Sequence, residues 1–403
     1  MAYDLVIKNG TVVDGSGAPA QRADVAVADG KIVEIGKITD GAEEIVDASD
    51  CVVSPGFIDP HTHYDAQICW DGAVTPSSWH GVTSVVMGNC GVGIAPCLPE
   101  TREIAMRDLV NVEGIPFDVL NTGITWDWET FPEFMDAAQA RNPAVNLAFL
   151  APLTPFRHYV MGEESMDRAA TPEEIKKIAG LIGEAIDAGA FGLSTTILNQ
   201  HVGYEGRPLA CRNADDAELT AYARVLKARG KGTIEIAATK KLGVIDDDQY
   251  ALLDMLLTES CRPVTFLGLV DRDDIPNAAQ DTLEKTAPLL ERGVRPQILP
   301  LPLTREFSMR NPFSFAAFPS WNQVFVDQSK EGQRAVYADS QFRNAFREEL
   351  KDPINFSDFN RIIQHEVKNP ELKKFEGHTV TEIAREQGKD DVDTLLDITI
   401  EDD

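Results

Sequence analysis

From residue 55 onward, short apolar runs alternate with amphipathic helical patterns, and this alternation limits the fold more than any other feature. Seven apolar runs have the length of buried strands, and they lie at 56–61, 81–88, 145–150, 190–194, 232–236, 263–269 and 294–299. Near-continuous apolar strands separated by helices predict a parallel sheet covered on both faces. About seven such units favour an α/β fold of the (β/α)8 or TIM-barrel type.

Helical patterns separate these runs, and the clearest covers residues 171–188. Thr171 suits the N-cap, and Glu174 completes a capping box. Apolar residues recur every three or four positions along the segment, and Gly189 is placed to end the helix. A second helical pattern spans about 216–229. Strand and helix signals therefore alternate, as a parallel α/β fold requires.

An open, doubly wound sheet is the alternative architecture for such a pattern. No glycine-rich phosphate loop follows any of the runs, which removes the usual ligand site of that fold. An eighth strand is not apparent, because residues 303–377 form a long polar and aromatic excursion and a helical pattern follows it. We therefore expect a barrel that lacks its last strand.

Residues 1–54 have a different pattern and predict a small antiparallel sheet. Short apolar strands flank Asn9-Gly10 and Asp29-Gly30, and both dipeptides are typical of hairpin turns. Three or four short strands bury too little surface to be stable alone. We therefore expect two domains, a sheet over 1–54 that leans on a barrel over 55–403, with an insertion at about 303–377.

The charge balance argues against two classes of partner. The 403 residues include 65 acidic and 37 basic side chains, for a formal net charge of −28. Nucleic acids and anionic membranes attract a positive field, so we expect neither as a partner. No apolar run approaches the roughly 20 residues of a membrane-spanning helix, and the first residues lack a secretory signal pattern. These features predict a cytoplasmic protein and leave a homo-oligomer open.

Two histidines close to the first apolar run are candidate metal ligands. His61 and His63 follow Pro55-Gly56 and the run Phe57-Ile58, and residues i and i+2 of an extended chain face the same way. Both imidazoles can therefore reach one metal ion. A His-x-His pair also arises by chance, but this pair lies at the carboxyl end of a strand, where parallel barrels hold their chemistry.

Three segments carry a family resemblance. They are 6–15, 55–63 and 81–91, which contain Lys8-Asn9-Gly10-Thr11, His61-Thr62-His63 and Gly88-Asn89-Cys90-Gly91. Together with 126–131 they are similar to the amidohydrolase superfamily, and within it to the D-aminoacylase or N-acyl-D-amino-acid deacylase branch. The resemblance implies a zinc-dependent barrel with a small β-sandwich formed by both chain ends, residues 1–54 being its N-terminal part. It also implies hydrolysis of a small-molecule N-acyl amino acid or related amide.

The resemblance also implies roles for individual residues. His61 and His63 match metal ligands at the end of the first barrel strand, and Cys90 matches a zinc ligand at the end of the second. Zinc binds thiolate well, while a small buried residue is the alternative for Cys90. Because no secretory signal is present, we expect the six cysteines to be thiols or metal ligands rather than disulfides. Tyr204 matches a substrate-contacting tyrosine after the fourth strand.

The later strands depart from the family pattern. The family has a histidine after the fifth strand and another after the sixth, but segments 235–240 and 265–271 contain none. Glu235 is a candidate replacement metal ligand. An ion pair between Glu235 and Lys240 or Lys241 is the alternative.

The catalytic aspartate of the family, its general base, lies on the eighth barrel strand. Because we find no such strand, we expect this aspartate beyond residue 403 and the chain to be an N-terminal portion of a longer protein. In the complete site, metal-activated water attacks the amide carbon, and the aspartate moves a proton to the leaving nitrogen. Without that group we expect the 403-residue chain to be weakly active or inactive.

Two functions stay open at this point. One is a metal-dependent amidohydrolase of the D-aminoacylase type, whose substrate carboxylate binds Arg305 or Arg310, since guanidinium groups bind carboxylates well. The other is a non-catalytic barrel that keeps the fold and part of the metal site as a binding or scaffold subunit. The absence of the two later histidines supports the second function.

Overall fold

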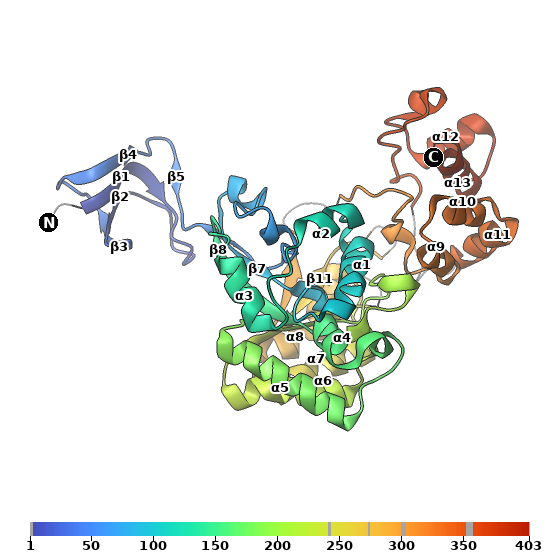
Figure 1. Ribbon diagram of the computed structural model, residues 1–403. Helices are drawn as coiled ribbons and strands as arrows, with labels where there is room; N and C mark the ends of the chain where they lie inside the picture. Colours follow the sequence, from blue (N-terminus) through green and yellow to red (C-terminus); the bar gives the residue numbers. More distant parts are fainter. Residues whose placement is uncertain (1–2, 241–242, 273–274, 300–303, 352–357, 403) are drawn as a thin grey trace. The chain divides into compact units, whose positions relative to one another are not determined.

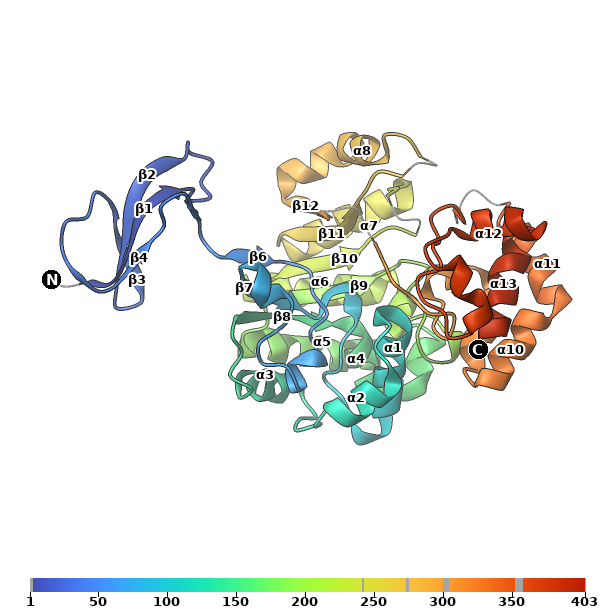
Figure 2. The ribbon, with the colours of Figure 1, turned by 90° about the horizontal axis from the view of Figure 1, so that it is seen from above.

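The computed structural model describes residues 3–240, 243–272, 275–299, 304–351 and 358–402 (Figure 1, Figure 2). The chain divides into two compact units. The first unit contains residues 1–59 and 76–84, and the second contains residues 60–75 and 85–403. Every residue of the candidate site belongs to the second unit.

The first unit contains a small five-stranded sheet. Its strands are β1 (Tyr3–Val12), β2 (Gln21–Ala28), β3 (Lys31–Gly36), β4 (Ala42–Asp47) and β5 (Val52–Val53). Their order is β3-β2-β1-β4, and β5 also pairs with β1. β2 and β3 form an antiparallel hairpin around Asp29-Gly30, so the turn predicted there is confirmed. Val6, Ala26 and Ile38 form the core of this unit.

The Asn9-Gly10 dipeptide is not a hairpin turn, and that prediction is wrong. β1 runs through both residues, because it pairs in parallel with β4 and β5 and antiparallel with β2, so the sheet is mixed rather than antiparallel. Asn9 has a φ of 62°, and its N–H donates to Asp24 Oδ1 at 2.8 Å. A Cβ on Gly10 would lie 2.4 Å from Val53 Cγ2. The dipeptide is therefore a bulge that lets β5 approach β1.

The second sheet contains the seven strands predicted from the sequence. They are β6 (Phe57–Asp59), β7 (Val82–Met87), β8 (Asn146–Pro152), β9 (Gly192–Thr196), β10 (Thr233–Ala237), β11 (Val264–Leu269) and β12 (Val294–Ile298). β8 to β12 pair in parallel with their neighbours. The strand order is β12-β11-β10-β9-β8-β7-β6, as Figure 2 shows.

This strand order follows the chain without a reversal, and it decides between the two predicted architectures. A doubly wound sheet reverses its strand order at a switch point, where its ligand binds. The sheet here has no reversal among the described strands. Successive βα units in chain order are the arrangement of a barrel-type fold, in which the carboxyl ends of the strands share one edge.

Helices follow the strands in the expected alternation. Three helices lie between β7 and β8, namely α1 (Arg102–Glu113), α2 (Phe117–Gly123) and α3 (Phe131–Gln139), and the later ones are α4 (Leu153–Met161), α5 (Pro172–Ala188), α6 (Asp216–Arg229), α7 (Asp247–Ser260) and α8 (Ala278–Arg292). Figure 1 shows α5, α6 and α7 side by side beneath the strands. Thr171 and Glu174 form the predicted capping box of α5, and Gly189 ends it at a φ of 115°. None of the described helices is long and apolar enough to span a bilayer.

The excursion after β12 forms a helical cluster together with the last helices. Its helices are α9 (Asn322–Val326), α10 (Lys330–Ala338), α11 (Ser340–Glu349), α12 (Val380–Gln387) and α13 (Asp391–Asp402). Aromatic rings fill its core. Trp321 stacks on Phe315 with 4.4 Å between centroids, and Phe346 makes edge-to-face contact with both rings. The aromatic residues that the sequence places in this excursion therefore form a core of their own.

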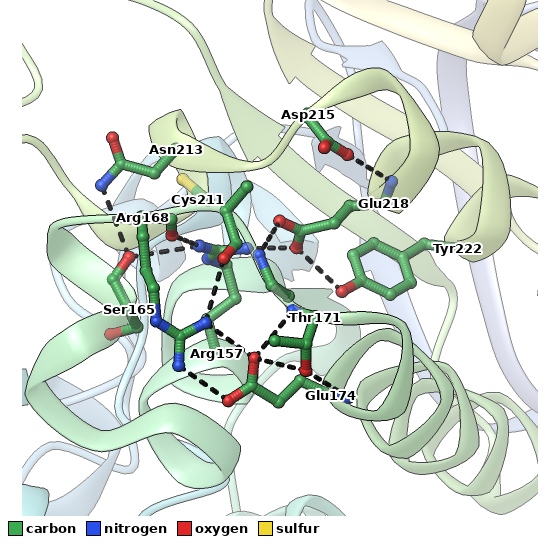
Figure 3. A network of polar contacts seen from close by, with 12 residues as sticks. Arg157, Ser165, Arg168, Thr171, Glu174, Cys211, Asn213, Asp215, Glu218 and Tyr222 are labelled. Atoms are coloured by element: carbon green, nitrogen blue, oxygen red, sulfur yellow. Dashed lines mark hydrogen bonds and ion pairs between the residues drawn. The ribbon is translucent and has the colours of Figure 1, made fainter.

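A buried ion pair connects the helices beneath the sheet. Arg157 on α4 pairs with Glu218 on α6, and both side chains are 0% exposed. Glu218 also accepts hydrogen bonds from the Tyr222 hydroxyl at 3.0 Å and from the Ala170 N–H at 2.7 Å, while Arg157 donates to Arg168 O at 2.7 Å. Figure 3 shows the two charged groups facing each other within this network. Each buried charge thus has an opposite charge and further hydrogen bonds.

We expect Glu218→Gln to destabilise the fold strongly, because it leaves the Arg157 charge buried without its counter-charge. The expected loss in the free energy of unfolding is about 3–5 kcal/mol. Glu259→Gln is the matched control, since Glu259 pairs with the exposed Arg224, and it should cost less than about 1 kcal/mol. Urea unfolding of both variants measures the difference, and equal losses would contradict a structural role for the buried pair.

Candidate metal centre

The segment after β6 holds the two predicted histidines close together. The residue between them, Thr62, is bound to β7, because its N–H and Oγ1 both donate to Val86 O, at 3.0 and 2.7 Å. His61 and His63 therefore lie on the other side of the segment, as alternate residues of an extended chain do. Their imidazole rings are 5.3 Å apart between centroids.

Cys90 reaches the same place from a tight turn that follows β7. The turn covers Asn89–Gly91, and Cys90 itself has a φ of 56°. Gly88 precedes the turn at a φ of 76°, and a Cβ on it would lie 2.4 Å from Leu150 O. The left-handed backbone and this close approach explain why a glycine precedes Asn89 and Cys90 in the Gly-Asn-Cys-Gly motif.

The donor atoms of His61, His63 and Cys90 converge within 4.8 Å of one another. His61 Nε2 lies 3.3 Å from Cys90 Sγ. Tetrahedral Zn²⁺ at about 2.0–2.1 Å from nitrogen and 2.3 Å from sulfur would separate two such atoms by about 3.6 Å. The structure thus brings the three predicted ligands together at a spacing that suits one ion.

The electrostatics of the three donors also fit a cation. Burial raises the pKa of the Cys90 thiol well above its usual range, and the nearby Glu235 carboxylate raises it further. Burial lowers the pKa of His63 to about 4, and the charge of Arg305 contributes. His63 Nδ1 is buried and has no hydrogen-bond partner among the described residues. A divalent cation would hold Cys90 as a thiolate, and neutral imidazole is the form that binds metal.

A buried and a half-buried carboxyl group, those of Glu235 and Glu113, lie beside this cluster. Glu235 on β10 accepts the Cys90 N–H at 2.7 Å through Oε2, and its Oε1 lies 3.8 Å from His61 Nδ1. Burial raises the pKa of Glu235 to about 8. Glu113, at the end of α1, lies 3.7 Å from His63 Nε2, and burial raises its pKa as well. Glu235 is not one of the three converging donors, so its role as a metal ligand stays a prediction.

A comparison with known families agrees with this geometry. A profile described as the amidohydrolase family matches residues 44–320, which is more than half of the chain. The chain belongs to the amidohydrolase family.

Relatives and solved structures of the amidohydrolase family extend this result. The D-aminoacylase of Alcaligenes xylosoxydans xylosoxydans is 40% identical over 194 residues, which cover 48% of this chain and 37% of that relative. A D-aminoacylase variant solved in complex with CuCl2 is 24% identical, with a TM-score of 0.65 over 98% of this chain and 70% of that one. The N-acyl-D-glutamate deacylase of Bordetella bronchiseptica, solved with zinc and a phosphonate inhibitor, is 22% identical, with a TM-score of 0.62 over 100% and 70%. The structural likenesses and the parallel sheet fit a TIM-barrel-like fold. The aligned residues cover 37% of the Alcaligenes D-aminoacylase, so this chain matches well under two thirds of that relative's length.

The alternative ion pair of Glu235 is not present in the described part of the structure. Lys240 is exposed, and the hydrogen bond of Glu235 goes to the backbone of Cys90 instead. Lys241 lies outside the described residues. The Glu235 carboxylate faces inward from β10 and holds the turn of Cys90 through that hydrogen bond. Its burial keeps it away from Lys240 at the surface.

Three residues at the centre were not predicted from the sequence. Gln297 on β12 places Oε1 2.7 Å from His61 Nδ1, and Glu113 lies beside His63. His201 is buried nearby, where burial and the charge of His63 lower its pKa to about 3. A polar residue within the apolar run 294–299 was a usable signal for Gln297. No local sequence pattern indicates that Glu113 and His201 lie at the metal centre, because the packing of α1 and of the loop after β9 places them there.

The predicted substrate-contacting residues line two cavities. Arg305 and Arg310 line a cavity of about 770 Å³. Arg305 Nη2 donates to Val112 O at 2.9 Å, and the guanidinium lies 3.8 Å from the ring centroid of Phe313. Tyr204 lines a second cavity of about 330 Å³. Their roles in substrate binding stay predictions.

We expect the wild-type chain to bind about one zinc ion and Cys90→Ser to lose it. The expected loss in affinity is at least about 100-fold, since even the outer partners of metal ligands contribute 10–100-fold. Cys97→Ser is the matched control, because Cys97 is also buried and its thiol contacts Leu98 O and Thr101 Oγ1 instead. Competition titration with a chelating zinc indicator measures the affinities. Retention of zinc by Cys90→Ser would contradict the proposed donor set.

Proposed function

We propose that this chain forms the metal-binding part of a zinc-dependent amide hydrolase that acts on N-acyl-D-amino acids or related small amides. The convergence of His61, His63 and Cys90 carries this proposal. They meet beside the carboxyl ends of parallel strands, where barrels of this type hold their catalytic groups. Family membership supports amide hydrolysis, and the likeness to the D-aminoacylase supports the class of substrate.

The residues of the chain define where the reaction takes place. When bound, zinc lowers the pKa of a coordinated water and polarises the substrate carbonyl. His61 and His63 offer imidazole nitrogens, and Cys90 offers sulfur from a turn that Glu235 holds through the Cys90 N–H. Glu235 remains our candidate for a further metal contact. No described residue is assigned the proton transfer to the leaving nitrogen.

Arg305 is our candidate for binding the substrate carboxylate. Its charge is close enough to the centre to lower the pKa of His63. It lines the cavity of about 770 Å³ together with Arg310. The same cavity is lined by apolar side chains that suit an acyl group, namely Phe307, Met309 and Ile362. Tyr204 is our candidate for a second substrate contact.

A non-catalytic binding or scaffold subunit is the alternative function. It is favoured by segments 235–240 and 265–271, which cover the ends of the fifth and sixth strands of the sheet pattern and the residues just after them, without the histidines that the family resemblance implies. A chain of this kind would keep the barrel while binding metal weakly. The metal titration described above separates the two functions, because only the hydrolase needs a tightly bound ion.

We place the protein in the cytoplasm, as a homo-oligomer or a monomer that acts on small molecules. The net charge of −28 supports this setting, because it disfavours nucleic acid and anionic membrane as partners.

We expect zinc-loaded protein to hydrolyse N-acetyl-D-amino acids faster than their L-enantiomers, at a low rate. A chelator and His63→Ala should each remove the activity, because both remove the metal. His378→Ala is the control, since the exposed His378 lies in the helical cluster and is not among the residues that line the cavity of Arg305. Ninhydrin detection of the released amine measures the rate. Turnover that survives both the chelator and His63→Ala would contradict the metal-dependent mechanism.

We expect Arg305→Gln to weaken binding of N-acetyl-D-amino acids by about 10–100-fold, as loss of a charge-assisted hydrogen bond of roughly 1.5–3 kcal/mol does. Isothermal titration calorimetry on zinc-loaded protein measures this. Ligands whose carboxylate is replaced by a carboxamide provide the control, because their binding should not depend on the guanidinium charge. Equal weakening for both ligands would indicate a packing role for Arg305 instead.

A further inference from the structure

We propose that Gln297 is a positioning residue for the metal centre, which fixes the tautomer of His61 so that Nε2 is presented to the ion. The inference rests on the proposed function, because it concerns side chains that contact the ligands of the same metal site. We call these side chains the outer layer. The side chains involved come from β10, β11 and β12, the last three strands of the parallel sheet.

The contact between Gln297 and His61 determines which nitrogen carries the proton. Gln297 Oε1 lies 2.7 Å from His61 Nδ1. A carbonyl oxygen only accepts hydrogen bonds, so Nδ1 must be the protonated nitrogen. Nε2 then has the lone pair, and it is the nitrogen that lies 3.3 Å from Cys90 Sγ. The histidine is thereby oriented with its ligand atom toward the other donors.

The amide of Gln297 is itself held by a neighbouring strand. Gln297 Nε2 donates to Thr265 Oγ1 at 3.4 Å, and Thr265 lies on β11 beside β12. If the amide were turned over, its NH2 group would face His61 Nδ1, and Nε2 of the histidine would have to carry the proton. Because a hydroxyl both donates and accepts, Thr265 holds the amide in place, and the lone pair that His61 Nε2 needs as a metal ligand selects the orientation in which Oε1 faces Nδ1.

Glu235 supports the same arrangement from β10. Its Oε1 lies 3.8 Å from His61 Nδ1 and has no hydrogen-bond partner within the described part of the chain, although the residue is 1% exposed. Its Oε2 accepts the N–H of Cys90. One carboxylate therefore lies near the protonated nitrogen of His61 and also holds the backbone of Cys90. Outer partners of this kind orient metal-binding histidines and raise their basicity.

These contacts give the later strands a role in this chain. The family resemblance implies histidines after the fifth and sixth strands, where segments 235–240 and 265–271 contain none. Two of the residues found there, Glu235 and Thr265, reach toward His61 directly or through Gln297. The donors to the ion thus follow β6 and β7, while side chains of β10, β11 and β12 form an outer layer that orients His61.

Binding of Co²⁺ to the full chain tests the inference. We expect Gln297→Leu to weaken cobalt affinity by about 10–100-fold, and to diminish the thiolate-to-cobalt charge-transfer absorption at equal cobalt concentration. Gln297→Glu keeps an oxygen acceptor near His61 Nδ1, so its affinity should stay within about threefold of wild type or rise. Gln280→Leu is the control, because the Gln280 amide bonds to Glu284 on α8. Thermal unfolding of the metal-free variants shows whether each one folds.

The outcomes separate this inference from the proposed function. Failure of the wild-type chain to bind cobalt would overturn both. Tight binding by wild type and equally tight binding by Gln297→Leu would overturn only the role of Gln297. An equal loss for the Leu and Glu variants, with both folded, would mean that an oxygen acceptor beside His61 Nδ1 does not support metal binding, and this also overturns the positioning role.

Discussion

The arrangement of the site depends on one constraint, which is that parallel strands laid down in chain order bring their carboxyl ends to the same edge of a sheet. His61 and His63 follow β6, and Cys90 follows β7. Glu235 lies within β10, and Gln297 lies near the end of β12. Residues separated by up to 236 positions in the sequence therefore come within hydrogen-bonding distance. Neither motif would form a centre without the sheet.

Burial sets the chemistry of that centre. An isolated buried thiol resists ionisation, and an isolated buried imidazole resists protonation, as the shifted pKa values of Cys90 and His63 indicate. Two acidic side chains, the buried Glu235 and the half-buried Glu113, lie in the same place, and burial raises the pKa of each. A site with this composition is best satisfied by a cation, because one ion stabilises the thiolate and uses the imidazole lone pairs.

Much of the fold was accessible from the sequence because its signals are local. The seven strand runs and the capping box of α5 follow from apolar periodicity and from side chains that satisfy nearby backbone groups. Asn9-Gly10 was misread for the opposite reason. Its local preference is a turn, but pairing of β1 with β4 and β5 overrides that preference and makes it a bulge.

The candidate site was only partly accessible for a related reason. The spacing of His61 and His63 and the glycines around Cys90 are visible in the sequence. Glu113, His201 and the Gln297 contact depend on how distant elements pack, and no local pattern records that packing. Lys240 shows the same limit, since an ion pair with Glu235 was reasonable by proximity in sequence, but β10 turns the carboxylate inward.

The central claim is that one metal ion binds two imidazoles and the thiolate of Cys90. X-ray absorption at the zinc K-edge of the zinc-loaded chain tests it most directly, since this measurement identifies the donor atoms and their distances without any assay of turnover. The account predicts one sulfur at about 2.3 Å and two imidazole nitrogens at about 2.0–2.1 Å. A first shell of oxygen and nitrogen without sulfur would contradict it.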